Sequence, residues 1–364
     1  MMKQFHICHI ILRLDVGGLE RVLINLINTM PNNFKHSIIC LEIATDFGKL
    51  LNKQVDIIEL EKLPGREFKT HRKIFFWLLK NKPEVVQTYN LPAVEYQSLA
   101  WLARVPLRIH AEHGREVDDI DGLNRKRNLL RKISLPFATK VVSVSNDLTN
   151  WLKDTLKIKA EKIIFIANGI DTNVFCYKNV TPYEFVIGAV GRIDDVKNHE
   201  LLIRLGKYLR ENEPSIFEDI TIEIIGDGPG LSKMRALVAS EKLDDKILFL
   251  GKSFNIVEKL NTFSLFLQPS KYEAMPMTVL EAMACRLPVI ASNVGGIPKV
   301  INHGKNGLLF EANSLEALAE RVIYLYHNEN KRTYLAANAR EDAVRNYSCK
   351  AMAENYKKLY ESVN

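Results

Sequence analysis

The feature that most constrains the fold is a repeated alternation of short apolar runs with segments of helical periodicity. Residues 5–12 (FHICHIIL) form a mainly apolar run typical of a buried strand, and residues 18–30 have the pattern of a helix that ends before Pro31. We expect further strands at residues 36–43, 56–60, 84–89, 107–113, 140–145, 162–170, 185–193, 220–226, 246–251, 264–269 and 287–292. This alternation predicts parallel sheets with helices on both faces.

A polar segment divides this series in two. Residues 168–183 are rich in turn residues and separate a finished series of strands from a new one. We therefore expect two doubly wound parallel-sheet α/β domains, at residues 1–175 and 176–345. Because ligands bind at the carboxyl ends of strands in such sheets, we expect the domains to face each other across a cleft. Expected helices include residues 71–81, 93–105 and 349–363.

Cysteine usage and hydropathy narrow the class of protein. The five cysteines are scattered, with no CxxC pair and no histidine at ligand spacing, which favours reduced thiols over a disulfide framework or a zinc site. No apolar run approaches the roughly 20 residues that a membrane-spanning helix needs. The N-terminus lacks the apolar core of a signal peptide, so we expect a cytoplasmic protein.

The net positive charge lies in the first half of the chain. Residues 1–175 hold 26 Lys and Arg against 19 Asp and Glu, a net charge of +7, whereas the remaining residues hold 24 of each kind. Five cations fall within residues 125–132 (RKRNLLRK). A basic surface favours an anionic partner, although an ordinary solvated helix face is the simpler account of this one cluster. No interleaving of aromatic and basic residues indicates nucleic acid.

Two strand ends carry features suited to phosphate. Gly17 and Gly18 lie between a strand and a helix, where the backbone can approach an anion at the helix N-terminus; a tight turn without a ligand explains them equally well. Arg192 follows another strand and Lys197 enters the next helix, a placement that suits the two phosphates of a diphosphate. The glycine-rich turn in residues 224–230 (IIGDGPG) fits close backbone packing or a ligand.

Two glutamates flank another expected turn from strand to helix. Glu273 lies in the turn and Glu281 on the second turn of the helix, so both carboxylates fall at one sheet edge. Glu281 can accept two ribose hydroxyls, and Glu273 can bind sugar hydroxyls beside the reacting carbon. The free N–H groups of Met277 and Thr278 would face phosphate through the helix dipole. In the alternative account, Glu281 faces solvent and Glu273 caps the helix.

At these glutamates the chain resembles a known family. The pair matches the E-x7-E signature of retaining glycosyltransferases with the GT-B fold, specifically the nucleotide-sugar family 4. The motifs DVGGLERV, KPEVVQTYN, VSVSNDL, ANGIDTNVF, VGRIDDVKN, IIGDGPG, FLGKS and HGKNGLLF occur in the order that family shows, over nearly the whole chain. Residues 111–127 are similar to a bacterial subgroup tied to extracellular polysaccharide synthesis.

The resemblance implies a role for each part of the chain. The first Rossmann-like domain would bind the acceptor and the second the nucleotide sugar, while residues 346–364 would form a helix that crosses back to the first domain. Gly17 and Gly18 would approach the donor phosphate, and Arg192 and Lys197 would neutralise the leaving diphosphate.

The same resemblance implies roles for the sugar-binding residues. Glu281 would hold the nucleotide ribose and Glu273 the transferred sugar. His113 matches a histidine near the sugar and the acceptor in relatives; without the family, a structural histidine would be the simpler account. Lys252 and Phe254 fall where relatives contact the base.

A few positions depart from the family pattern. Met275 and Pro276 stand where Phe-Gly is common, Arg286 replaces a small glycine, and Lys299 stands where relatives have an acid. These changes leave the phosphate cations and the glutamate pair intact, so they bear on donor identity more than on activity.

We expect neither a metal nor another cofactor. Residues 119–121 (DID) fit the DxD string of metal-dependent transferases, but they lie in a polar loop. Arg192 and Lys197 already supply positive charge for the phosphates, and the nucleotide sugar is a co-substrate.

The expected function is that of a retaining, metal-independent hexosyltransferase. It would move a sugar from a nucleotide diphosphate sugar, UDP-sugar before GDP-sugar, to a glycan or lipid-linked saccharide in exopolysaccharide or cell-surface polysaccharide synthesis. The basic first domain would also suit an anionic membrane surface, at the inner face of the plasma membrane. Two alternatives stay open: a sugar-nucleotide epimerase, which needs no acceptor, and a non-catalytic sugar-nucleotide-binding protein.

Overall fold

The computed structural model describes residues 4–63, 65, 68–116, 118–178, 184–253 and 255–362. The chain divides into two compact units: unit 1 comprises Met1–Gly169 and Cys349–Asn364, and unit 2 comprises Ile170–Ser348. The expected limits, after residues 175 and 345, differ from these by a few residues. The last helix thus belongs to unit 1, although unit 2 precedes it in the sequence.

Unit 1 is built on a seven-stranded sheet in the order β3-β2-β1-β4-β5-β6-β7, and every strand pair is parallel. Its strands are β1 (Phe5–Ile11), β2 (Phe34–Cys40), β3 (Asp56–Glu59), β4 (Val85–Tyr89), β5 (Leu107–Glu112), β6 (Lys140–Ser143) and β7 (Ile163–Phe165). Its helices are α1 (Gly18–Thr29), η1 (Asp46–Leu50), α2 (Phe68–Asn81), α3 (Asn90–Val94), α4 (Gln97–Leu102), α5 (Arg125–Ser134), η2 (Leu135–Phe137), α6 (Asn146–Asp154), η3 (Ala160–Lys162) and α15 (Cys349–Glu361).

Unit 2 repeats this plan with a six-stranded parallel sheet in the order β10-β9-β8-β11-β12-β13. Its strands are β8 (Phe185–Val190), β9 (Ile220–Ile225), β10 (Ile247–Gly251), β11 (Leu265–Gln268), β12 (Val289–Ser292) and β13 (Leu308–Phe310). Its helices are α7 (Glu200–Asn212), α8 (Pro214–Asp219), α9 (Leu231–Ser240), α10 (Ile256–Leu260), α11 (Met277–Ala284), α12 (Ile297–Val300), α13 (Leu315–His327) and α14 (Glu329–Asn346). The expected doubly wound architecture is confirmed in both units.

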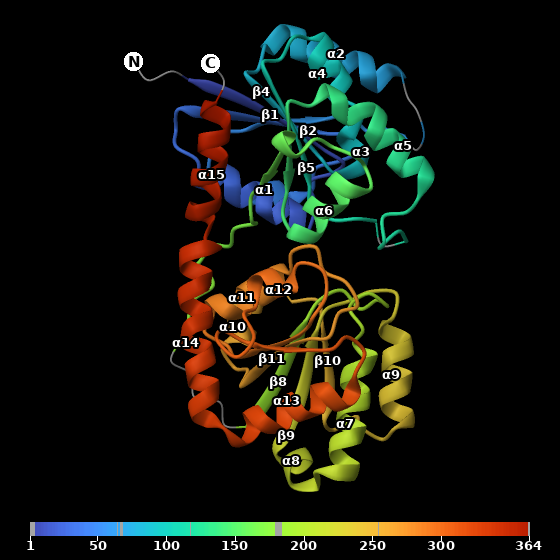
Figure 1. Ribbon diagram of the computed structural model, residues 1–364, viewed down its shortest axis with the longest axis vertical. Helices are drawn as coiled ribbons and strands as arrows, with labels where there is room; N and C mark the ends of the chain where they lie inside the picture. Colours follow the sequence, from blue (N-terminus) through green and yellow to red (C-terminus); the bar gives the residue numbers. More distant parts are fainter. Residues whose placement is uncertain are drawn as a thin grey trace. The chain divides into compact units, whose positions relative to one another are not determined.

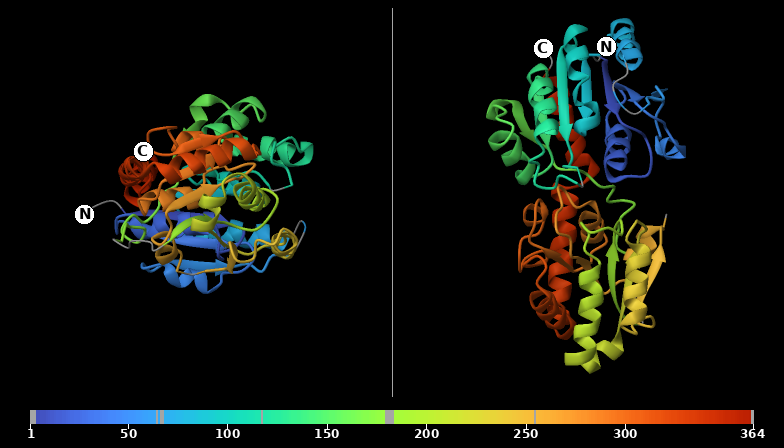
Figure 2. Two further views of the ribbon diagram at one scale, coloured as in Figure 1. Left: turned by 90° about the horizontal axis from the view of Figure 1, so that it is seen from below. Right: turned by 90° about the vertical axis from the view of Figure 1, so that its right-hand side faces the viewer.

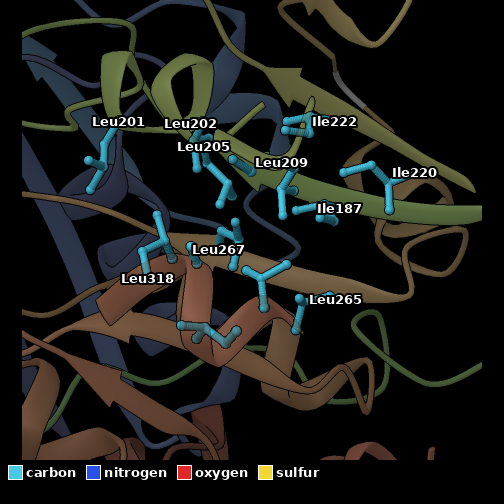
Figure 3. Packing of buried hydrophobic residues seen from close by; sticks show 14 of the residues in the cluster. Ile187, Leu201, Leu202, Leu205, Leu209, Ile220, Ile222, Leu265, Leu267 and Leu318 are labelled. Carbon is cyan, nitrogen blue, oxygen red and sulfur yellow. The ribbon is translucent and has the colours of Figure 1, made fainter. Parts of the chain in front are cut away.

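Each sheet carries helices on both faces (Figures 1 and 2). In unit 2 one stripe of α7, comprising Leu201, Leu202, Leu205 and Leu209, packs onto the strands (Figure 3). In unit 1 the side chains of α2 and α4 cover one face of the sheet, while α1 and α15 lie side by side (Figure 1). Burial of these apolar stripes supplies most of the stability of a helix in such a fold.

Two elements differ from the expected pattern. The single helix expected at residues 93–105 is two short helices, α3 and α4, because Tyr96 and Ser98 donate their backbone N–H groups to carbonyls three residues back and tighten the chain between them. The strand β13 was not expected, since its run of three residues is too short to give a periodic signal. Among the described residues no helix is long and apolar enough to cross a membrane.

The strand orders fix where ligands can bind. In unit 1 the order reverses between β1 and β4, and in unit 2 it reverses between β8 and β11. In doubly wound sheets the ligand crevice lies outside the carboxyl ends of the strands at this reversal. The loops that follow β1, β4, β8 and β11 therefore frame the candidate site in each unit.

Candidate active site

The loop after β8 presents the two predicted phosphate cations. Asp194 organises it: one carboxylate oxygen accepts the backbone N–H groups of Val196, at 3.1 Å, and Lys197, at 3.0 Å. The other oxygen lies 3.5 Å from Nε of Arg192. The Arg192 side chain is 61% exposed, so most of its guanidinium remains open to a ligand.

Lys197 and Glu273 are in direct contact across the reversal point of unit 2. Nζ of Lys197 donates to Oε1 of Glu273 at 2.5 Å, and the glutamate is 7% exposed. Gln268 and Ser270 also donate to this oxygen, both at 2.8 Å. In the described part of the chain, Oε2 of Glu273 accepts no hydrogen bond. The polar ends of β8 and β11 thus hold one carboxylate from three sides.

The helix that follows, α11, begins at Met277. Its N-cap residue is Pro276, which has no side chain that can cap, so the alternative account in which Glu273 caps this helix is wrong. Thr278 donates its hydroxyl to Gln268 Oε1 at 3.0 Å and so ties the helix to the glutamate network. Glu281 is half-buried on the second turn, and its ribose-binding role stays a prediction.

The glycine-rich turn after β9 is explained by packing. A Cβ atom on Gly226 would lie 1.8 Å from the carbonyl oxygen of Gly191, and one on Gly228 would lie 2.4 Å from that of Ile193. The turn therefore presses directly against the loop that carries Arg192. Lys252, after β10, is exposed, and Phe254 lies outside the described residues.

In unit 1, Gly17 and Gly18 begin α1, and Gly17 is its extended N-cap residue. A Cβ atom on Gly17 would meet the Glu20 carboxylate at 2.1 Å. Burial raises the pKa of Glu20, a shift that its hydrogen bond to the backbone opposes. Glu20 was not among the expected site residues, although an acid in the first turn of a helix is a recognised signal. The space that glycine leaves is therefore occupied by this side chain.

His113 directly follows β5, where the sequence predicts a residue near the sugar and the acceptor. Both ring nitrogens are buried and neither meets a described partner at full hydrogen-bond geometry, whereas the Asn168 side chain lies near enough to act on the pKa of the ring as a hydrogen-bond partner. Burial lowers the pKa of His113 to about 4, with the Glu112 carboxylate and the Asn168 side chain opposing the shift. Buried polar atoms are rarely left unpaired. The Asn168 side chain is the partner that the pKa of the ring indicates, and the sugar- and acceptor-binding role of His113 stays a prediction.

A buried ion pair holds the segment that carries His113. Arg131 of α5 donates to both oxygens of Glu112, at 2.8 and 3.2 Å, and both side chains are fully buried. Arg131 also pairs with Glu116, and Arg127 pairs with Asp118. Two of the five cations in residues 125–132 are thus used inside unit 1, so the basic face is smaller than the sequence suggested.

The first acid of the DxD string, Asp119, has a structural use. Oδ1 of Asp119 accepts the backbone N–H groups of Leu123 and Asn124, at 2.9 and 3.0 Å. Asp119 therefore shapes the turn that leads into α5, and the interpretation of this string as a loop agrees with its contacts.

Comparison with known proteins identifies the family to which the chain belongs. Residues 16–174 match the family model described as Glycosyltransferase Family 4, and residues 178–342 match the model described as Glycosyl transferases group 1. Together the two models cover most of the chain.

Similar proteins have been described in bacteria. The chain is 27% identical over 307 residues to N-acetyl-alpha-D-glucosaminyl L-malate synthase of Bacillus anthracis, an alignment that covers 79% of this chain and 78% of that protein. It is 24% identical over 387 residues to UDP-Gal:alpha-D-GlcNAc-diphosphoundecaprenol alpha-1,3-galactosyltransferase of Escherichia coli, covering 99% and 98%.

Solved structures share the fold. The crystal structure of Anabaena HepE in complex with UDP and glucose matches with a TM-score of 0.84 at 18% sequence identity, covering 98% of this chain and 99% of that one. The chain belongs to the glycosyltransferases of the GT-B fold, with a Glycosyltransferase Family 4 domain followed by a Glycosyl transferases group 1 domain.

Proposed function

We propose that the chain is a retaining, metal-independent hexosyltransferase that uses a nucleotide diphosphate sugar as donor. The observation that carries the proposal is the contact between Lys197 and Glu273 at the reversal point of unit 2. In this proposal Lys197 serves the diphosphate and its neighbour Glu273 serves the sugar. Retention rests on the E-x7-E resemblance of Glu273 and Glu281.

The chemistry of the bond that breaks explains the need for cations. The C1–O bond to the diphosphate breaks with its electron pair left on the phosphate, while the acceptor oxygen bonds to C1 and its proton passes to the departing phosphate. Arg192 offers a guanidinium, and Lys197 has three N–H donors, of which the bond to Glu273 uses one. Fixed cations stabilise the growing negative charge better than water does.

The proposed donor is a UDP-sugar, with a GDP-sugar next. The galactosyltransferase relative is named for UDP-Gal, and HepE was crystallised with UDP, which supports this order. In this proposal Glu281 holds the ribose and the N-terminus of α11 faces phosphate. In the same proposal Lys252 contacts the base.

The proposed acceptor is a glycan or lipid-linked saccharide of surface polysaccharide synthesis. The relative from Escherichia coli is named for a diphosphoundecaprenol acceptor.

Unit 1 also exposes large apolar side chains on α4 and α5, namely Trp101, Leu102, Leu129 and Ile133, with the exposed Lys132 beside Ile133. Exposed apolar side chains with a basic neighbour suit an anionic membrane, so we propose peripheral attachment through unit 1.

The test of the reaction is a donor screen with product analysis. The protein is incubated with UDP- and GDP-sugars and diphosphoundecaprenol-linked saccharides, with and without EDTA. We expect release of the nucleotide diphosphate only with acceptor present, no effect of EDTA, and an α-linked product from an α-linked donor by NMR. Inversion of the anomeric centre, or loss of turnover in EDTA, would contradict the mechanism.

The same screen separates the alternatives. Conversion of the donor to an isomer without acceptor would indicate an epimerase. Thermal stabilisation by a nucleotide sugar without any product would indicate a binding protein, since a ligand at about 100 times its Kd stabilises a protein by about 2.7 kcal/mol.

A further inference from the structure

We propose that Asn90 is a positioning residue for His113, an inference that rests on the proposed function. Asn90 directly follows β4, and β4 pairs with β5 so that Tyr89 lies opposite Ala111. This pairing brings Asn90 to the point where the chain leaves β5. There Oδ1 of Asn90 accepts the backbone N–H of His113 at 2.7 Å.

The backbone at Asn90 indicates that its side chain is needed there. Asn90 has a φ of +53°, in the left-handed region that glycine adopts at the lowest cost. Glycine at position 90 would remove the backbone strain, but it would leave the N–H of His113 without its hydrogen-bond acceptor. Asparagine is among the few residues that tolerate this region and also carry a short hydrogen-bond acceptor. Residues in sparsely populated conformations cluster at functional sites.

A second contact fixes the imidazole ring. The ring centroids of Tyr89 and His113 lie 5.7 Å apart. The Tyr89 hydroxyl is 2.9 Å from Nδ1 of His9, and Nε2 of His9 is 3.0 Å from Nδ1 of His36. All three supporting side chains are buried, so Tyr89 cannot readily move away from His113.

The two contacts have separate tasks. Tyr89 restricts the movement of the His113 ring, while Asn90 fixes the backbone of His113, from which the ring projects. In this proposal the imidazole of His113, for which the Asn168 side chain is the partner indicated within the described part of unit 1, offers one donor and one acceptor to sugar or acceptor hydroxyls. A shift of this backbone by about 1 Å can lower a rate by about 10²-fold.

The test compares Asn90→Gly, which keeps the backbone conformation but lacks the acceptor, with Asn90→Asp, which keeps both. We expect Asn90→Gly to lower kcat by about 10- to 100-fold with the donor KM unchanged, and Asn90→Asp to restore most of the rate. Thermal unfolding of each full-length variant checks that it folds. A kcat at the wild-type level in Asn90→Gly would overturn the proposal.

A measurement without substrate supports the rate data. The ring of His113 is titrated by NMR, with its signal assigned by its loss in His113→Gln. The titratable and charged groups around it are Glu112, His110 and Tyr89. We expect its pKa to rise from about 4 toward 6.5 in Asn90→Gly, because a mobile ring gains water. An unchanged pKa with lower thermal stability would mean that Asn90 is merely structural.

His113→Gln also separates this inference from the proposed function. If His113→Gln loses turnover and Asn90→Gly does not, the positioning role alone is wrong. If His113→Gln turns over like the wild type, the proposed role of His113 is wrong.

Discussion

Arg286 illustrates how a single residue departs from what its backbone position favours. It follows the last turn of α11 with a φ of +60°, and its guanidinium carbon lies 5.3 Å from the centroid of the Tyr177 ring. The resemblance to the family predicts a small glycine here, which the left-handed conformation favours. The backbone of Arg286 is strained in this conformation, and the contact of its guanidinium with Tyr177 offsets part of the strain energy.

Replacing this residue tests that explanation. We expect Arg286→Gly to raise the free energy of unfolding by about 0.5–1 kcal/mol, because the strain is removed. Arg286→Ala is the matched control, since it keeps the strain and loses the Tyr177 contact, and we expect it to be no more stable than the wild type. The measurement is chemical denaturation. A destabilised Arg286→Gly variant would show that the arginine contacts outweigh the strain.

At the residue scale, the sequence singled out Lys197, Glu273 and Thr278, which the structure brings into one network, but not Gln268 and Ser270 of the same network. Lys197 and Glu273 stood out because charges at strand ends must be solvated or used. Gln268 and Ser270 gave no such signal, since neutral polar residues near a strand end have many uses. Asn90 was missed because its partner, His113, becomes its neighbour only when β4 pairs with β5.

At the scale of elements, the turn between β12 and α12 supports the site by packing. Gly295 has a φ of +53°, and a Cβ atom there would lie 2.0 Å from the carbonyl oxygen of Glu273. The next residue, Gly296, donates its N–H to that same oxygen at 2.7 Å. The turn between β12 and α12 therefore holds the backbone carbonyl of Glu273 in place.

This contact predicts a difference between two glycine substitutions. Gly304 has a φ of +76°, but no described atom lies within 4 Å of the position that a Cβ atom would take, so Gly304→Ala should cost only about 1–2 kcal/mol of backbone strain. Gly295→Ala adds a collision with Glu273, so we expect a larger loss of stability and a lower kcat. Denaturation and donor turnover are compared for both variants. Equal stability and equal turnover would rule out this role for the turn.

Elements with a clear period were predictable and short ones were not. The strands of both sheets follow from apolar runs, whereas the break between α3 and α4 depends on local backbone hydrogen bonds. The basic run in residues 125–132 shows the same limit. Its charge was visible in the sequence, but the pairing of Arg131 with Glu112 requires the tertiary fold.

At the scale of the whole molecule, buried neutral histidines predict sensitivity to acid. Burial lowers the pKa of His36 to about 3 and that of His199 to about 4, and it lowers the pKa of His9 well below its ordinary value. The unfolded chain binds protons at these positions near pH 6.5 and the folded chain does not. The free energy of unfolding therefore has its full value above pH 6.5, and it decreases as the pH falls toward the pKa values that these histidines have in the folded protein.

We expect each buried histidine to remove about 1.4 kcal/mol of stability per pH unit in this range. The check is the free energy of unfolding from about pH 8 to about pH 5. The variant His199→Gln, in unit 2, should show a shallower slope than the wild type. A slope that His199→Gln leaves unchanged would mean that His199 is charged, or solvated, in the folded protein.

The central claim is that Arg192 and Lys197 stabilise the departing diphosphate. The most direct test is the rate of nucleotide diphosphate release at saturating donor and acceptor, with Lys233→Ala as control because Lys233 is an exposed cation on α9. We expect Arg192→Ala and Lys197→Ala each to lower this rate by about 10²- to 10³-fold, and Lys233→Ala to leave it unchanged. An Arg192→Ala variant with the wild-type rate would contradict the account.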